Sequence, residues 1–152
     1  MRKILFLDID GVVNNSKSHE KYSYRGMLGI DPNLAFLVGK IVLDTGCEVV
    51  LSSSWRGSEK REQHIREQVC DFVDVTPHCT SGVRGAEIHL WLMRNCARFG
   101  STGYNQKDVR VAILDDSSDM LMWQKDCFFR TSWDEGITPE IAEAVTKHLN
   151  GV

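Results

Sequence analysis

Two aspartates stand directly after the first apolar run of the chain. Residues 3–7 (Lys-Ile-Leu-Phe-Leu) lead into Asp8, Ile9, Asp10 and Gly11. In a strand-like backbone alternate side chains point the same way, so the carboxylates of Asp8 and Asp10 crowd one small volume. They repel each other there unless a cation or phosphate chemistry uses them. Gly11 lets the chain turn sharply after them. A surface Asp-Ile-Asp-Gly turn is the alternative that this stretch alone leaves open.

A second apolar run also ends in acidic residues. Residues 109–114 lead into Asp115 and Asp116, and Asp119 follows. An apolar run that ends in acids is typical of a buried parallel strand at the carboxyl edge of a sheet, where open α/β sheets bind ligands. Two strands that deliver carboxylates to one edge are hard to explain as surface decoration. Oxygen-rich ligation of this kind suits Mg²⁺.

Hydroxyl and basic side chains follow two other elements. Ser52 ends the apolar run of residues 47–52 and Ser53 follows it. Their hydroxyls can bind a phosphoryl oxygen without adding charge, or cap the next helix. The forked guanidinium of Arg56 suits oxyanions, with a solvated arginine as the alternative. Arg84 begins a predicted helix, where the helix dipole disfavours a cation. Its position indicates an anion nearby, unless it is a plain surface arginine.

The elements that must hold these side chains alternate along the chain. Asp31-Pro32 supplies the N-cap and first position of a helix that Gly46 ends. The sequence predicts strands at residues 3–7, 47–52, 72–75, 109–114 and 127–130, and helices at residues 32–45, 58–69, 84–99 and 139–149. A strand, a helix and a second strand in succession form one right-handed crossover unit. We therefore predict an α/β fold with a parallel sheet.

The polar segment of residues 14–29 leaves the first strand beside Asp8. It is punctuated by glycine, and its length and position predict a loop or small β-hairpin that forms a flap over the site. A plain solvated loop fits the same residues. Lys17, Lys21 and Arg25 make the segment basic, and Trp55 is read as a packed side chain rather than a base-stacking platform.

Size and composition favour one domain spanning residues 1–152. The formal charge of −3 gives no global nucleic-acid signature, so any polyanion site must be local. The five cysteines are odd in number and contain no Cys-x-x-Cys pair, which argues against a zinc site or disulfide framework and favours a cytoplasmic setting. The first apolar run is short and is broken by Asp8, so neither a signal peptide nor a membrane span is expected.

With these residues assembled, the chain resembles the haloacid dehalogenase (HAD) superfamily of aspartate-nucleophile phosphohydrolases. The resemblance covers essentially the whole chain and lies in four ordered motifs. These are residues 8–12 (Asp-Ile-Asp-Gly-Val), Ser52, the basic Arg84, and the acidic group of Asp115, Asp116 and Asp119. The resemblance implies a three-layer Rossmann-like sheet with helices on both faces. The intervals between motifs leave no room for a cap domain.

The resemblance also implies a division of labour. Asp8 would attack phosphorus and form an aspartyl-phosphate, while Asp10 would protonate the leaving group and later activate water. Mg²⁺ would be held by Asp8, the Asp10 backbone carbonyl and Asp115, with Asp116 or Asp119 nearby through water.

The remaining motif residues are expected to bind the substrate. The hydroxyl of Ser52 and the guanidinium of Arg84 would bind phosphoryl oxygens. Ser53, Arg56 and Gly11 are predicted to contact the substrate as well. Lys107 is a rival for the basic position, but it precedes its strand and so should lie at the opposite edge of the sheet.

An open site without a cap implies a large phosphorylated substrate, such as an RNA or DNA end or a phosphoprotein. The finer resemblance is to the HAD domains of "Swiss-army-knife" RNA repair proteins and to the phosphatase half of polynucleotide kinase-phosphatase. We therefore expect a monomeric 3′-phosphatase acting on nucleic-acid ends. The alternatives are a phosphatase of a small metabolite or nucleotide whose site is closed by oligomerisation, and a non-catalytic module that binds RNA ends or a protein.

Overall fold

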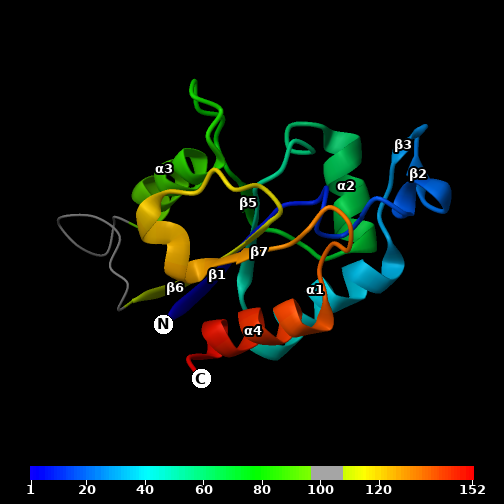
Figure 1. The fold of residues 1–152 in the computed structure, drawn as a ribbon. Coiled ribbons are helices and arrows are strands. Elements are labelled where there is room, and N and C mark those ends of the chain that lie inside the picture. Colours follow the sequence, from blue (N-terminus) through cyan, green and yellow to red (C-terminus); the bar gives the residue numbers. More distant parts are fainter. Residues whose placement is uncertain (97–107) are drawn as a thin grey trace.

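The computed structural model describes residues 1–96 and 108–152 of the chain. Its centre is a five-stranded parallel sheet in the order β5-β4-β1-β6-β7 (Figure 1). The strands are β1 (Arg2–Leu7), β4 (Glu48–Leu51), β5 (Asp74–Val75), β6 (Val109–Asp115) and β7 (Phe128–Arg130). The α-helices are α1 (Pro32–Thr45), α2 (Glu59–Gln68), α3 (Arg84–Cys96) and α4 (Pro139–Asn150).

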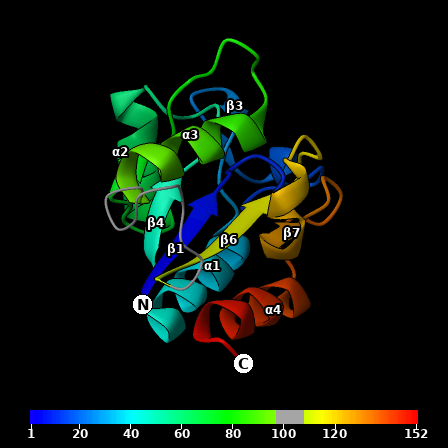
Figure 2. The same ribbon diagram turned by 90° about the vertical axis from the view of Figure 1, so that its left-hand side faces the viewer.

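Alternation along β1 sends its side chains into two separate cores. Ile4 and Phe6 are buried in a core with apolar residues of α3, whereas Leu5 and Leu7 are buried with those of α1 and α4. Figure 2 shows α3 on one side of the sheet and α1 and α4 on the other. This is the predicted three-layer Rossmann-like arrangement, and no cap domain lies within residues 1–96 or 108–152.

The helix boundaries follow from local chemistry. The Asp31 side chain accepts a hydrogen bond from the Asn33 amide at 2.9 Å and caps α1, which begins at Pro32. Gly46 ends this helix in the left-handed conformation, at φ 65°. Both boundaries were predicted from the sequence. Among the described residues no helix has the length and apolar character needed to cross a membrane.

The strands β4, β1 and β6 end at one edge of the sheet. Backbone hydrogen bonds between them continue just past their last residues. The Asp8 amide donates to the Leu114 carbonyl at 3.0 Å, and the Ser52 amide donates to the Leu7 carbonyl at 2.8 Å. These bonds extend the sheet ladder past the last strand residues. They fix the backbones of Asp8 and Ser52 beside the end of β6, which is Asp115.

The segment of residues 14–29 contains a hairpin rather than a plain loop. A short 3₁₀ turn, Ser18–Glu20, precedes the antiparallel strands β2 (Ser23–Tyr24) and β3 (Met27–Leu28). The turn between them passes through Arg25 at φ 52° and Gly26 at φ 76°. The hairpin form was one of the two alternatives that the sequence left open.

A 3₁₀ helix near the end of the chain was not predicted. Residues Met122–Cys127 form a 3₁₀ helix, which is too short to show a helical period. It is fixed by the buried Gln124, whose side chain accepts from the Leu121 amide and donates to the Gly85 carbonyl of α3. The predicted end of α3 at Phe99 and the rival basic residue Lys107 lie outside the described residues.

Candidate active site

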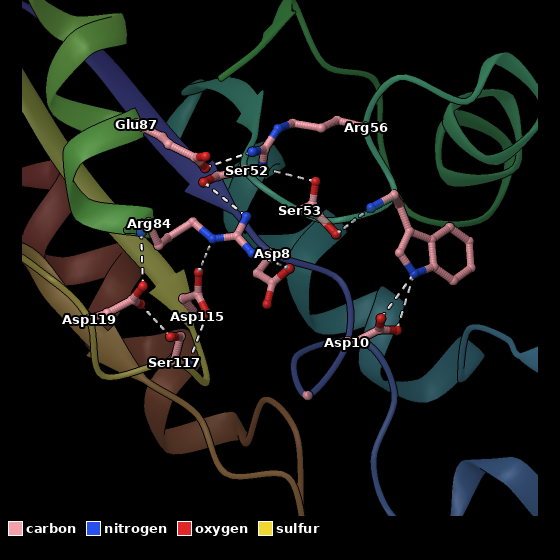
Figure 3. A network of polar contacts seen from close by, with 12 residues as sticks. Asp8, Asp10, Ser52, Ser53, Arg56, Arg84, Glu87, Asp115, Ser117 and Asp119 are labelled. Carbon is pink, nitrogen blue, oxygen red and sulfur yellow. Dashed lines mark hydrogen bonds and ion pairs between the residues drawn. The ribbon is translucent and has the colours of Figure 1, made fainter. Parts of the chain in front are cut away.

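Three aspartates from two neighbouring strand ends form one acidic cluster. Asp8 follows β1, Asp115 ends β6, and Asp116 comes next in the chain. One carboxylate oxygen of each lies within 4.8 Å of those of the other two. Asp8 and Asp115 are buried, and Asp116 is partly buried. Figure 3 shows Asp8 and Asp115 facing Arg84 of α3.

Without a cation, ionising all three aspartates of the cluster is energetically unfavourable. Burial, reinforced by the nearby Asp115 carboxylate, raises the pKa of Asp8 well above its usual range. Burial likewise raises the pKa of Asp115 to about 6, and it raises the pKa of Asp116. A cation placed among the three oxygens would reverse this balance by favouring the ionised forms.

The oxygen atoms of Asp115 fit a metal ligand. Oδ1 accepts a hydrogen bond from the Ser117 amide at 2.9 Å, which orients the carboxylate. Oδ2 is buried and accepts no hydrogen bond among the described residues, and its ion-pair neighbour is Arg84 Nε at 3.5 Å. A buried oxygen without a hydrogen bond, next to two further carboxylates, is the all-oxygen donor set that suits Mg²⁺.

We predict that Asp115→Asn stabilises the metal-free protein at neutral pH. The folded state keeps the Asp115 proton between the usual carboxyl pKa near 3.8 and a pKa of about 6, whereas the unfolded state releases it. The stability of the wild type therefore falls as the pH rises through this window. The variant avoids this loss and should be more stable above pH 6 by up to about 3 kcal/mol, with no such gain below pH 4.

Urea unfolding in the presence of a chelator at pH 4 to 8 tests this expectation. Asp119→Asn is the matched control, because hydrogen bonds from Ser117 and the Arg84 amide outweigh burial and lower the pKa of Asp119. That variant should lose stability above pH 4 instead. An Asp115→Asn protein no more stable than the wild type at pH 8 would contradict the electrostatic strain assigned to this cluster.

Arg84 supplies the positive charge at the site. Its Nη2 lies 4.0 Å from Asp8 Oδ1, and its Nη1 is within 3.5 Å of the Ser52 hydroxyl oxygen, to which it donates. The sequence indicated an anion near this helix start, and the carboxylates of Asp8 and Asp115 lie there. The guanidinium therefore connects the ends of β1, β4 and β6 (Figure 3).

Asp119 holds the start of α3 and does not join the acidic cluster. Its Oδ2 accepts from the Arg84 amide at 2.9 Å, and its carbonyl accepts from the Gly85 amide at 3.1 Å. It also accepts from the Ser117 hydroxyl. A carboxylate at a helix N-terminus compensates the unpaired amides there. Of the two aspartates left open by the sequence, Asp116 is the one in the cluster.

Asp10 is held apart from the cluster by two donors. The Trp55 indole Nε1 lies 3.1 Å and 3.2 Å from the two Asp10 carboxylate oxygens, and the Asn14 side-chain Nδ2 donates to Asp10 Oδ1 at 2.9 Å. Trp55 is buried, as the packed interpretation predicted. The indole therefore also orients a carboxylate of the site.

A model of the HAD domain in Swiss Army Knife RNA repair proteins matches residues 4–142 of the chain. The chain belongs to this family. The match spans the four motifs and agrees with the capless three-layer fold. Searches of the curated proteins and of the solved structures find no match to the chain.

Ser52 and Ser53 of this HAD domain are in different environments. The Ser52 hydroxyl faces Arg84, as expected for a residue that binds the same anion. Ser53 is completely buried, and its hydroxyl oxygen accepts from the Trp55 amide at 3.2 Å, while its carbonyl accepts from Arg56. These bonds hold Ser53 in the turn after β4, and its contact with the substrate stays a prediction.

Gly11 is needed for the close packing beside Asp116. Its φ of 79° is in the left-handed region, and a Cβ there would overlap the Asp116 carboxylate. Its amide donates to Asn14 Oδ1 at 2.8 Å, and its carbonyl accepts from the Thr131 hydroxyl at 2.6 Å. Both backbone groups therefore have partners within the protein, and contact between Gly11 and the substrate stays a prediction.

Arg56, predicted to contact the substrate, has several partners within the protein. Its guanidinium is buried and forms an ion pair with Glu87 of α3 at 2.6 Å. It also contacts His78 Nδ1 at 2.9 Å and donates to the Ser53 carbonyl at 3.0 Å. Its Nε is buried without a hydrogen-bond partner among the described residues. The remaining contacts of Arg56 hold the loops around the site together, and its contact with a phosphate stays a prediction.

Sequence reasoning missed the partners that hold this HAD domain's site together. Asn14, Glu87 and Thr131 are buried polar residues that bond to Asp10, Arg56 and Gly11 respectively. One signal was available for Glu87, because an acid beside Ile88 and Trp91 adjoins the apolar face of a helix and needs a buried partner. For Thr131 the sequence carried no signal.

Proposed function

We propose that this HAD domain is a Mg²⁺-dependent phosphohydrolase in which Asp8 is the nucleophile. The observation that carries the proposal is the buried Asp8 carboxylate beside Asp115 and Asp116, with Arg84 Nη2 at 4.0 Å. Mg²⁺ would be held by these three aspartates, with the Asp10 backbone carbonyl as a further ligand, and would offset the repulsion between an anionic nucleophile and an anionic phosphate. Membership of the HAD family supports the same chemistry.

The residues divide the reaction into two displacements. A carboxylate oxygen of Asp8 bonds to phosphorus as the bond to the leaving oxygen breaks, and Asp10 gives that oxygen a proton. Asp10 then takes a proton from water, which attacks phosphorus, releases inorganic phosphate and regenerates the Asp8 carboxylate. Arg84 and the Ser52 hydroxyl bind the phosphoryl oxygens throughout, where negative charge builds up.

We further propose that the substrate is a terminal phosphate of RNA or DNA, with a 3′-phosphate preferred. Three observations support this substrate class. The described residues contain no cap domain that would exclude a polymer. The matching family model is drawn from RNA repair proteins. The hairpin beside Asp10 carries the exposed bases Lys21 and Arg25.

A matched panel of phosphate esters tests the function. Phosphate release is measured with Mg²⁺ on 3′-phosphate and 5′-phosphate oligonucleotides, mononucleotides, a phosphopeptide and an aryl phosphate. The proposal expects fastest turnover of the 3′-phosphate oligonucleotide and loss of turnover with a chelator. Release from small esters alone would move the function to metabolite turnover. Absence of release from every ester, despite Mg²⁺ binding, would favour a binding module.

Trp55→Phe is expected to slow turnover while leaving the fold intact. The substitution keeps an aromatic ring but removes the Nε1 donor that holds Asp10. Hydrogen bonds to charged groups contribute about 1.5–3 kcal/mol, so kcat should fall by roughly 10- to 100-fold, with little change in KM.

Trp91→Phe is a closely matched control for this prediction. Trp91 is also buried and its Nε1 donates to the carboxylate of Asp74 at 2.7 Å, on the other face of the sheet and away from the site. The Trp91→Phe variant loses an equivalent hydrogen bond, so its free energy of unfolding should fall while its kcat stays unchanged. Equal kcat values for the two variants would exclude a positioning role for Trp55.

A further inference from the structure

A groove lies between the β2–β3 hairpin and helix α2. Its volume is about 480 Å³, and its lining combines an aromatic ring, an imidazole, two bases, two acids and an amide. The lining residues are Tyr24, Arg25, Glu59, Lys60, Gln63, His64 and Glu67. None of these residues takes part in the chemistry proposed for Asp8. We call this feature the hairpin groove.

Three flat rings connect the hairpin groove to Asp10. Tyr24 stacks on His64 with ring centroids 4.3 Å apart and an interplanar angle of 20°. Trp55 lies nearly parallel to both, at 5.9 Å from Tyr24 and 6.4 Å from His64. Since Trp55 Nε1 bonds to Asp10, the Trp55 ring alone links the rings of the groove to this proposed general acid and base.

The rings offer stacking surfaces, and the charges around them are mixed. Burial lowers the pKa of His64, so its ring is uncharged at neutral pH and can stack as a flat, neutral surface. The Arg25 guanidinium lies 5.7 Å from the centre of the Tyr24 ring, and Arg61 lies 5.3 Å from that of Trp55. Aromatic rings and guanidinium planes are the surfaces on which unpaired bases stack.

The acidic residues of the groove favour a nucleobase over a phosphate group as the ligand. Glu59 and Glu67 line the same space as Arg25 and Lys60, so the lining has no net charge and would not concentrate a polyanion. Carboxylates and the Gln63 amide can accept hydrogen bonds from the amino groups of a base, as acidic side chains do from cytosine. The phosphates on either side of the base can reach the exposed Arg25 and Lys60.

We propose that the hairpin groove binds one nucleobase of a single-stranded nucleic acid whose terminal phosphate is held at Asp8. The base stacks against the Tyr24–His64 ring pair, beside the Arg25 guanidinium. This inference rests on the proposed function, because it assigns the groove to the same substrate. It gives the domain a reason to prefer an oligonucleotide over a mononucleotide or a small ester.

The test measures binding in the absence of turnover. The Asp8→Asn variant is titrated against fluorescent single-stranded RNA and DNA oligonucleotides, and fluorescence anisotropy gives Kd. Each oligonucleotide is made intact and with single abasic positions along its terminal segment. Tyr24→Ala, His64→Ala and Tyr24→Phe are each combined with Asp8→Asn. Tyr22→Ala, at a second tyrosine of the same segment outside the groove lining, is the matched control.

Stacking of a base on an aromatic residue contributes about 1–3 kcal/mol, so Tyr24→Ala should raise Kd for the intact oligonucleotide by roughly 5- to 150-fold. Tyr24→Phe and Tyr22→Ala should bind as the parent does. One abasic position should weaken binding by a similar factor, and Tyr24→Ala should have no further effect on that oligonucleotide. Such coupling would support a base in the groove.

Two results would overturn the inference. One is equal Kd values for the intact and all the abasic oligonucleotides on the parent protein, a comparison that needs no groove variant to fold. The other is an equal loss of affinity for both in Tyr24→Ala and in His64→Ala, which would mean that the groove contacts only the backbone. The proposed function fails by a different observation, the absence of phosphate release by the wild type.

Discussion

Asp8→Asn should abolish phosphate release from every ester that the wild-type domain hydrolyses. An asparagine amide cannot form the bond to phosphorus that a carboxylate forms, so the first displacement has no nucleophile. Losses on removal of a covalent nucleophile reach about 10⁶-fold, and we expect a fall in kcat of roughly 10⁴-fold or more. Steady-state phosphate release with Mg²⁺ measures it directly.

The stability of the same variant separates chemistry from folding. Asp8 is buried and shares its site with Asp115 and Asp116, so loss of its negative charge should leave the metal-free protein at least as stable at neutral pH. Asp44→Asn, an exposed aspartate on α1, is the control and should retain full turnover. Turnover within tenfold of the wild type in Asp8→Asn would exclude Asp8 as the nucleophile.

Arg56→Ala should cost about 3–5 kcal/mol of unfolding free energy, the largest stability effect that we expect from any single change near the site. The substitution leaves the Glu87 carboxylate buried without its guanidinium partner at 2.6 Å. It also removes the donor to the Ser53 carbonyl. Urea unfolding followed by circular dichroism measures the loss.

Two comparisons make the Arg56 result specific. Arg2→Ala removes a half-exposed ion pair with Glu48 and should cost at most about 1 kcal/mol. Combining Arg56→Met with Glu87→Leu replaces the buried pair by apolar side chains and should recover most of the loss. Full stability of Arg56→Ala together with a raised KM would instead identify Arg56 as a substrate clamp.

The meeting of Asp8, Ser52, Arg84 and Asp115 was predictable from the sequence because each stands at an element boundary. Parallel strands bring their carboxyl ends to one edge, so an apolar run that ends in an acid or serine places that side chain with little ambiguity. Arg84 adds a helix start at the same edge. The periodicity of apolar residues and the helix-capping residues therefore predicted most of the fold and the centre of the site.

The parts that could not be predicted depend on side-chain direction after a turn. Ser53 and Arg56 follow the same strand as Ser52, yet the turn after β4 carries Arg56 toward Glu87 of α3 and buries Ser53. The indole of Trp55 reaches Asp10 across 45 residues of sequence. No local pattern encodes these pairings, because they form only when separate loops pack together.

Trapping of the phosphoryl group on the protein tests the central claim most directly. An Asp10→Asn variant with Mg²⁺ and an aryl phosphate is quenched in acid, and the peptide that contains residues 8–12 is analysed by mass spectrometry. An aryl leaving group needs no proton from Asp10, and the variant lacks the base that activates water, so the aspartyl-phosphate should form and accumulate. The account predicts one added phosphoryl group, located on Asp8 and absent when Asp8 is also replaced by Asn. Phosphate release by the wild type with an unmodified Asp8 in the trapped variant would contradict it.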